Sequence, residues 1–562
     1  LSRRNTTSLH IKMDYKEVVA RKTKSLIDSI PKEWILSEIP TVDEQPNVCT
    51  YLDSFLPENE QKITSATVAE LIKLQKEKKI TALDIAYAFC HRAALVHQLT
   101  NCCTEIFFER AFETAKALDE YFKETGLLKG KLHGIPISLK DQINLPGITT
   151  AIGFVAPHIC EEFEKIVTGR PSRDSMSLIA KILEKQGAIF YVKTAVPMGM
   201  FGGETASNLG ITYNALDRKM SCGGSSGGEG ALIGGGGSII GLGTDLGGSI
   251  RMPSMAQGLF GLRPSSNRFP YLDIANSYPN QTISPSVVGP MCKNIEDLIY
   301  ISELILSDPM CDTDPKHLPI KWDQDVIRKG LKGKKIKLGI LKWDNEVMPH
   351  PPILNTIEKV KETLKSAEDK FEVIPLDGSK LPIKLSDSAQ LLLSLFSCDN
   401  YQEIENNCKL SGEKWIPRFA RNYPQPGKVD SVIDYQIKAG KKYENQVKFD
   451  KIFEQVDCFI MPSFSTVCWK EGEIYKVNNF YTRSINPFDL TSMTFPIGRV
   501  TKEDVPFERT NFATEGDKSN WEYYDHESQI GKPVSLQLVC KMYHEEECCA
   551  IVKEITEIMK AV

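Results

Sequence analysis

Residues 221–265 read SCGGSSGGEGALIGGGGSIIGLGTDLGGSIRMPSMAQGLFGLRPS, the densest run of Gly and Ser in the chain. A flexible Gly/Ser linker is repetitive and lacks apolar blocks, whereas this run contains two, at 231–233 and 238–242. A compact polar set follows the second block: Thr244, Asp245, Ser249 and Arg251. Many glycines among apolar residues predict backbone packed closely against backbone or a ligand, with N–H groups free to point at it.

The composition is typical of a large globular protein in a reducing compartment. The chain has 562 residues, 41% hydrophobic and 25% charged, so its core can be large and needs no disulfides. The 15 cysteines are odd in number and none shows C-x-x-C spacing, which favours reduced thiols in a cytoplasmic protein. A net charge of −5 gives no reason to expect nucleic acid as a partner. No run of 18 uncharged apolar residues occurs, so we expect no transmembrane segment.

Helical and strand patterns alternate along the chain. Apolar spacing and capping residues predict helices at 15–29, 66–78, 85–98, 109–125, 175–186, 352–365 and 544–559. Period-two or continuous apolar runs predict strands at 134–140, 187–192, 335–341, 371–376, 457–461, 490–500 and 533–540. This alternation predicts an α/β fold, a single large domain whose mixed twisted β-sheet is covered by helices on both faces. The polar segment 501–529 between two strands is expected to be a surface excursion.

Motifs for metals and cofactors are missing from the sequence. The nine histidines are dispersed, without an H-E-x-x-H motif or a His/Cys cluster along the chain, so we expect no metal. There is no Walker A motif, and no G-x-G-x-x-G follows a strand at the start of a helix. We therefore expect no cofactor.

Nucleophilic catalysis by a serine remains the most promising class of chemistry. Residues 224–228 match the G-x-S-x-G elbow of α/β-hydrolases, but that elbow needs a strand before it, and residues 214–221 look like loop. Ser249 has a better setting, because an apolar strand at 238–243 leads into its turn and a short helix can start at 250. Such a turn leaves backbone amides free for an oxyanion. On spacing alone, a purely structural glycine-rich turn is an equally good interpretation.

A serine nucleophile needs a proton acceptor, and no histidine has a distinctive setting. In the strand at 134–140, period two places Ile135, Ile137 and Leu139 on one face and Lys140 on the other. A lone lysine is ordinarily solvated or paired. If Lys140 is buried, desolvation lowers its pKa and leaves a neutral amine that can accept a proton.

These residues together resemble the amidase signature family. The matching segments are 221–253, HGIPISLKDQ at 133–142, YVKTAVP at 191–197 and KPVSLQLV at 532–539. They occur in the family's order, and the resemblance extends from about residue 65 to the C-terminus. It implies a division into an N-terminal arm with a short helix at 1–62 and an amidase signature domain at 63–562. Within the family, the chain is similar to the fungal acetamidase or general amidase branch, which is related to fatty acid amide hydrolases.

The resemblance also implies roles for individual residues. Ser249 would be the nucleophile, Ser225 a bridging serine after a cis peptide bond, and Lys140 the base of a Ser–Ser–Lys triad. Backbone amides of the turn would form the oxyanion hole, at Leu246, Gly247 and Gly248 together with Ser249. Supporting hydrogen bonds would come from Ser226, Thr244, Asp245 and Arg251. Met200 and Phe201 fall where relatives line the acyl channel, although ordinary core positions are an equally good interpretation.

The expected function is therefore hydrolysis of a small-molecule carboxylic acid amide to carboxylate and ammonia or amine. One alternative is an amidotransferase A-type subunit that passes ammonia within a tRNA-charging complex. Another is a non-catalytic relative used for binding, which the intact triad disfavours. The sequence does not decide the acyl length of the substrate. It leaves monomer and homodimer both open.

Overall fold

The computed structural model describes residues 14–169, 174–279, 281–330, 333–423, 427–478 and 480–561. Within these ranges, 11 strands form one sheet, in the order β1 (Cys103–Ile106), β3 (Ile189–Thr194), β2 (Pro136–Lys140), β6 (Ile240–Asp245), β8 (Val287–Cys292), β7 (Phe260–Arg263), β12 (Ser492–Arg499), β13 (Pro533–Cys540), β11 (Cys458–Pro462), β9 (Ile336–Leu341) and β10 (Phe371–Leu376). A separate hairpin joins β4 (Ala206–Ser207) to β5 (Gly210–Ile211).

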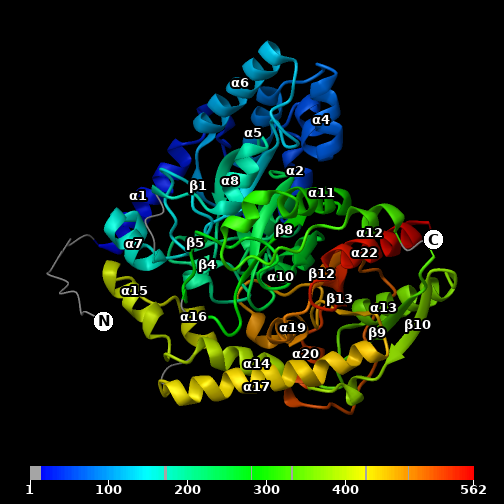
Figure 1. The fold of residues 1–562 in the computed structure, drawn as a ribbon. Coiled ribbons are helices and arrows are strands. Elements are labelled where there is room, and N and C mark those ends of the chain that lie inside the picture. The colour runs from blue at the N-terminus through cyan, green and yellow to red at the C-terminus, as the bar shows by residue number, and fades with distance from the viewer. Residues whose placement is uncertain are drawn as a thin grey trace.

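The sheet is mixed, as predicted. β3, β2 and β6 run parallel, and so do β11, β9 and β10, while the strands between these two groups pair antiparallel. Helices surround the sheet (Figure 1). In chain order they are α1 (Tyr15–Asp28), α2 (Val48–Leu52), α3 (Glu58–Ser65), α4 (Val68–Lys76), α5 (Ala82–Thr100), α6 (Phe108–Thr125), α7 (Glu161–Thr168), α8 (Leu178–Lys185), α9 (Gly227–Gly234), α10 (Arg251–Gln257), α11 (Ile295–Leu306), α12 (Gln324–Lys329), α13 (Pro351–Lys365), α14 (Leu385–Phe396), α15 (Gln402–Ser411), α16 (Pro417–Asn422), α17 (Val432–Asp450), α18 (Phe480–Arg483), α19 (Ile485–Phe488), α20 (Glu515–Glu522), α21 (His526–Gln529) and α22 (Glu545–Lys560).

Local capping signals explain several helix boundaries. Thr81 and Asp84 form a capping box at the start of α5, and α6 ends at Gly126, which adopts the left-handed conformation. The predicted helix at 66–78 is wrong at its start: α3 runs through Ser65, and α4 begins only at Val68. The reason is the capping box between Thr67 and Glu70, which fixes the start of α4.

The two faces of β2 contact different parts of the molecule. Ile137 and Leu139 pack into the largest apolar core, which also contains side chains of α8, α11 and α22. Ser138 and Lys140 point to the opposite face, where Ser138 donates a hydrogen bond to Glu229 of α9. The alternation expected for this strand is confirmed, and it delivers Lys140 to the face that carries the Gly/Ser segment.

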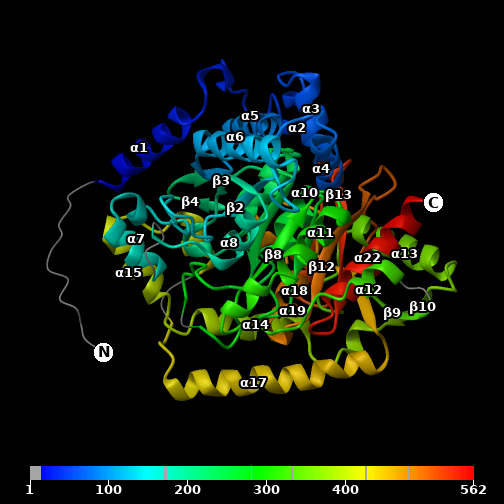
Figure 2. The same ribbon diagram turned by 45° about the horizontal axis from the view of Figure 1, so that its top comes forward.

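The N-terminal segment packs on the body of the molecule. Leu26, Trp34 and Leu52 share a buried apolar cluster with residues of α5 and β3. In Figure 2, α1 to α6 lie on one side of the molecule, and α17 runs along the opposite edge. A domain boundary at residue 62 stays a prediction, and residues 1–13 lie outside the described part of the chain. No helix in the described ranges is long and apolar enough to cross a membrane.

The segment 501–529 lies mostly at the surface, as expected, but it contains two helices and a few buried residues. It contains α20 and α21, and the fully buried Asp517 accepts hydrogen bonds from Arg509 and from the backbone amide of Met348. A buried carboxylate is stable only when it is paired in this way. The sequence showed the polarity of the segment but not the distant partner at residue 348.

Candidate functional site

Ser249 lies in the turn between β6 and α10, as predicted. The strand extends further than expected, to Asp245, and α10 starts at Arg251. The side chain of Asp245 organises the turn: its carboxylate accepts hydrogen bonds from the amides of Gly248 at 2.9 Å and Ile250 at 3.1 Å. Ser249 therefore projects from a turn that is held by a carboxylate at its start.

Asp245 and Arg251 form a fully buried ion pair. The Arg251 guanidinium contacts both carboxylate oxygens, each at 3.1 Å, and donates further to Gln537 and Asn486. Burial alone would raise the pKa of Asp245, but the adjacent Arg251, together with Asn486, holds it well below its ordinary value. Asp245 is thus a permanent anion at neutral pH. These contacts place both predicted supporting residues directly behind the Ser249 turn.

Lys140 is completely buried beside a hydroxyl group of the Gly/Ser segment. Its Nζ lies 2.8 Å from Ser225 Oγ and 2.7 Å from Thr244 Oγ1. Desolvation lowers the pKa of Lys140 to about 7, although the charge of Asp245 opposes the shift. A substantial fraction of this amine is therefore neutral at physiological pH.

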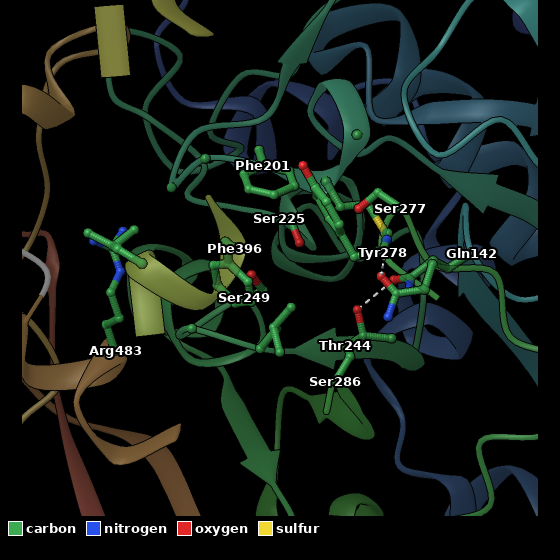
Figure 3. Close-up of a pocket in the computed structure, with 18 of the residues that line it drawn as sticks. Gln142, Phe201, Ser225, Thr244, Ser249, Ser277, Tyr278, Ser286, Phe396 and Arg483 are labelled. Carbon is green, nitrogen blue, oxygen red and sulfur yellow. Dashed lines mark hydrogen bonds between the residues drawn. The ribbon is translucent and has the colours of Figure 1, made fainter. Parts of the chain in front are cut away.

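The peptide bond between Gly224 and Ser225 is cis, as the family resemblance implies. The next residue, Ser226, links this segment to the Ser249 turn: its amide donates to the carbonyl of Ser249 at 3.1 Å. The Ser226 hydroxyl also contacts the backbone of Thr244, accepting from its amide at 3.3 Å. Ser225 and Ser249 both line one pocket (Figure 3).

The predicted oxyanion amides fall into two groups. Leu246, Gly247 and Ser249 line the pocket, and their amides donate to no other described residue. Gly248 is buried, and its amide is occupied by the Asp245 carboxylate. The expectation of a free Gly248 amide is wrong, because a side chain three residues earlier satisfies it.

Both expected substrate-contacting residues, Met200 and Phe201, line the same pocket. The Phe201 ring packs edge-on against an aromatic group from distant parts of the chain, namely Tyr278, Phe396, Tyr401, Phe419 and Tyr423. Three members of this group, Tyr278, Phe396 and Tyr423, line the pocket with Phe201. Aromatic rings therefore form part of the lining of the pocket that Ser249 also lines.

Two polar residues near Lys140 were missed by the sequence analysis. Gln142 accepts the Thr244 hydroxyl at 2.6 Å. Glu229 accepts hydrogen bonds from Ser138 and Thr194, and burial raises its pKa to about 8. Gln142 lies in the quoted family segment, two residues after Lys140, which was the available signal. Glu229 lies in the quoted family segment 221–253, but that segment did not indicate its partners, which come from two other strands.

One His/Cys group forms in space although the sequence shows none. His97 Nδ1 and the sulfur atoms of Cys102 and Cys103 lie within 4.8 Å of one another. The His97 nitrogen already accepts the backbone amide of Cys103 at 3.2 Å. The ends of α5 and β1 bring these residues together, away from the residues that line the Ser249 pocket.

Comparison with known proteins agrees with this geometry. The profile of the family described as Amidase matches residues 84–549. The chain belongs to the amidase signature family. An acetamidase from Emericella nidulans is 33% identical over 558 residues, which cover 97% of this chain and 98% of that protein. A probable amidase from Saccharomyces cerevisiae is 32% identical over 554 residues, covering 95% and 97%.

A solved structure of a fatty acid amide hydrolase is also similar. It aligns with a TM-score of 0.87 at 30% identity, covering 98% of this chain and 95% of that chain. As a member of the amidase signature family, this chain is an amidase, a hydrolase acting on amide bonds. These relatives give the amidotransferase alternative no support.

Proposed function

We propose that this amidase cleaves its substrate through an acyl-enzyme on Ser249, with Ser225 and Lys140 as the proton relay. The observation that supports this most strongly is the 2.8 Å contact between Lys140 Nζ and Ser225 Oγ, because it joins a low-pKa amine to a hydroxyl in the substrate pocket. The Thr244 hydroxyl donates to Gln142, so it accepts an N–H from Lys140. In the neutral amine, the lone pair is then available for the proton of Ser225.

The first half-reaction forms the acyl-enzyme, an ester between the acyl group of the substrate and Ser249. Ser249 Oγ attacks the amide carbonyl carbon while its proton passes to Ser225, and the proton of Ser225 passes to Lys140. The carbonyl oxygen becomes an oxyanion, which the amides of Leu246, Gly247 and Ser249 can bind. Loss of one such donor typically costs about 3 kcal/mol of transition-state stabilisation.

The tetrahedral intermediate then collapses. The relay returns a proton through Ser225 to the leaving nitrogen, the C–N bond breaks, and ammonia or an amine departs. In the second half-reaction, the relay accepts a proton from water, which attacks the ester carbonyl. The products are a carboxylic acid and regenerated Ser249. We propose no metal or cofactor for this cycle. We also propose that the protein is cytoplasmic, where the 15 cysteines stay as free thiols.

Trapping the ester tests the proposal. We expect an activated ester such as a p-nitrophenyl acylate to add one acyl mass to the protein after rapid acid quenching, with the label on the peptide that contains Ser249. The matched variants are S249A, which should take no label, and S254A, which alters a nearby buried serine of α10 and should still be acylated at Ser249. Labelling of S249A at an equal rate would refute the assignment of Ser249.

A further inference from the structure

Arg483 brings a guanidinium to the Ser249 pocket. It is the last residue of α18, 234 positions after Ser249 in the sequence, and its side chain lines the pocket. Figure 3 shows Arg483 across Ser249 from Gln142 in this view. A Cβ atom added to Gly247 would lie 3.8 Å from Cγ and 4.0 Å from Nε of Arg483. The side chain thus runs directly beside the turn that carries the nucleophile.

This guanidinium has no partner among the residues that the structure describes. Neither a hydrogen bond nor an ion pair within 4.0 Å links it to any of them. Burial lowers the pKa of Arg483, an effect opposed by the neighbouring Tyr423 and Tyr401, yet an arginine remains charged at neutral pH. Its five N–H donors are therefore available to a molecule in the pocket.

Three arginines that the described structure buries almost completely are each paired with a carboxylate, whereas the buried Arg218 donates to backbone carbonyls instead. Arg251 contacts Asp245, Arg263 contacts Asp489 at 2.6 Å, and Arg268 contacts Glu545 at 3.2 Å. Such pairing is the rule, because a desolvated charge without a counter-ion is costly. Arg483 departs from this rule in the pocket that Ser249 also lines, where a substrate can supply the missing anion.

The rest of the pocket is neutral. Within the described part of the chain, no Asp or Glu lines it, and Arg483 is its one charged lining residue. The other walls are aromatic, such as Phe396 and Tyr423, or uncharged and polar, such as Asn276 and Ser277. A single guanidinium in a neutral, partly apolar pocket matches a monoanion. A planar carboxylate fits best, since it can accept two parallel N–H bonds from the guanidinium fork.

We propose that Arg483 is a specificity-determining residue that binds a carboxylate carried by the amide substrate. This inference rests on the hydrolysis proposed above for the same site. The carboxylate has two possible sources. It lies on the acyl side in the monoamide of a dicarboxylic acid, and on the leaving side in an N-acyl amino acid. A neutral fatty amide would leave the guanidinium desolvated and unpaired.

Matched substrates test the proposal. On the acyl side, adipic acid monoamide is compared with hexanamide; on the leaving side, N-hexanoylglycine is compared with N-hexanoyl-ethylamine. We expect wild type to prefer the carboxylate member of one pair in kcat/KM. In R483M, the ratio of the two kcat/KM values within that pair should fall by about tenfold to a hundredfold, the range for hydrogen bonds to charged groups. R483K should retain part of the preference, because it keeps the charge but loses the fork.

A control and a charge reversal sharpen the result. R499M removes an exposed arginine that lies outside this pocket, and its ratio should equal that of wild type. R483E should disfavour the carboxylate member more strongly than R483M does. If R483M lowers both members of each pair equally, Arg483 merely supports the Gly247 turn and the proposal is overturned. The proposal would also be overturned if wild type hydrolysed the neutral amides without any preference for the carboxylate members. If wild type hydrolysed none of these amides, the proposed function itself would be refuted.

Discussion

The amine of Lys140 and the hydroxyl of Thr244 lie 2.7 Å apart in the buried centre of the site. Because Thr244 Oγ1 donates to Gln142 at 2.6 Å, it accepts from Lys140 and so fixes the direction of one N–H bond of the amine. With this N–H bond fixed, the lone pair of the neutral amine can face the hydroxyl of Ser225. In the mechanism proposed above, Thr244 therefore acts through Lys140 as a positioning residue.

We expect T244V to lower kcat for amides by about tenfold to a hundredfold, because Lys140 loses its orienting acceptor. A hydrogen bond to the ammonium form favours that form, so its loss lowers the pKa of Lys140 and moves the acid limb of the pH–rate profile to lower pH. A merely structural role would lower the rate without moving the limb. T100V removes another buried threonine hydroxyl, which donates to the Val96 carbonyl, and serves as the control.

The pH dependence of the wild-type enzyme follows from Lys140. In the proposed mechanism the neutral amine is the base, and its pKa is about 7, so kcat/KM for an uncharged amide should rise about tenfold per pH unit below that value and level off above it. Profiles measured from pH 5 to 9 test this expectation. A rate that falls with increasing pH through this range would contradict the role of Lys140 as a base.

The substitution K140A should damage amide hydrolysis more than ester hydrolysis. An amine is a poor leaving group unless it is protonated, whereas an alkoxide or phenolate leaves more easily, so loss of the relay affects the amide more. The measurement is kcat/KM for an amide and an ester with the same acyl group. K181A, an exposed lysine on α8, controls for the loss of positive charge. Equal losses for the two substrates would remove Lys140 from leaving-group protonation.

The turn before Ser249 offers a matched glycine pair. Gly248 has φ of +105°, and a Cβ there would lie 2.6 Å from the Thr482 hydroxyl oxygen, whereas a Cβ at Gly247 has its nearest contact at 3.5 Å. We expect G248A to lower kcat by at least about a hundredfold by displacing the oxyanion amides, and G247A to lower it less. Kinetics of both variants, with circular dichroism to verify folding, provide the test. A reversed order would show that the turn tolerates a side chain at 248.

The buried pair Asp245–Arg251 should dominate the stability of the site. In D245N the guanidinium of Arg251 stays buried without a counter-ion, which should lower the free energy of unfolding by about 3–5 kcal/mol. D325N breaks an exposed pair with Lys329 and should barely change the melting temperature. Since the folded pKa of Asp245 lies below its unfolded value, the stabilisation is present at neutral pH and is lost as the pH falls into the acid range. Thermal unfolding of both variants at pH 7 decides the matter.

Local sequence determined much of the secondary structure and part of the site. The Thr81–Asp84 capping box, the alternation that separates Lys140 from Leu139, and the strand–turn–helix around Ser249 all arise between residues a few positions apart. Such signals can be read directly, because spacing along the backbone dictates which side chains meet. The predicted helix start at residue 66 was wrong, because the capping box of Thr67 and Glu70 places the start of α4 at Val68.

Tertiary structure alone decided which groups complete the site. Glu229 receives hydrogen bonds from Ser138 and Thr194 on two other strands, and Arg483 reaches the Ser249 turn from 234 positions away. Which residues meet in space depends on how the helices pack on the sheet, so no local sequence pattern marks these contacts. The Gly/Ser segment therefore indicated the proposed nucleophile and its turn, whereas only the folded chain showed that an unpaired guanidinium lies beside them.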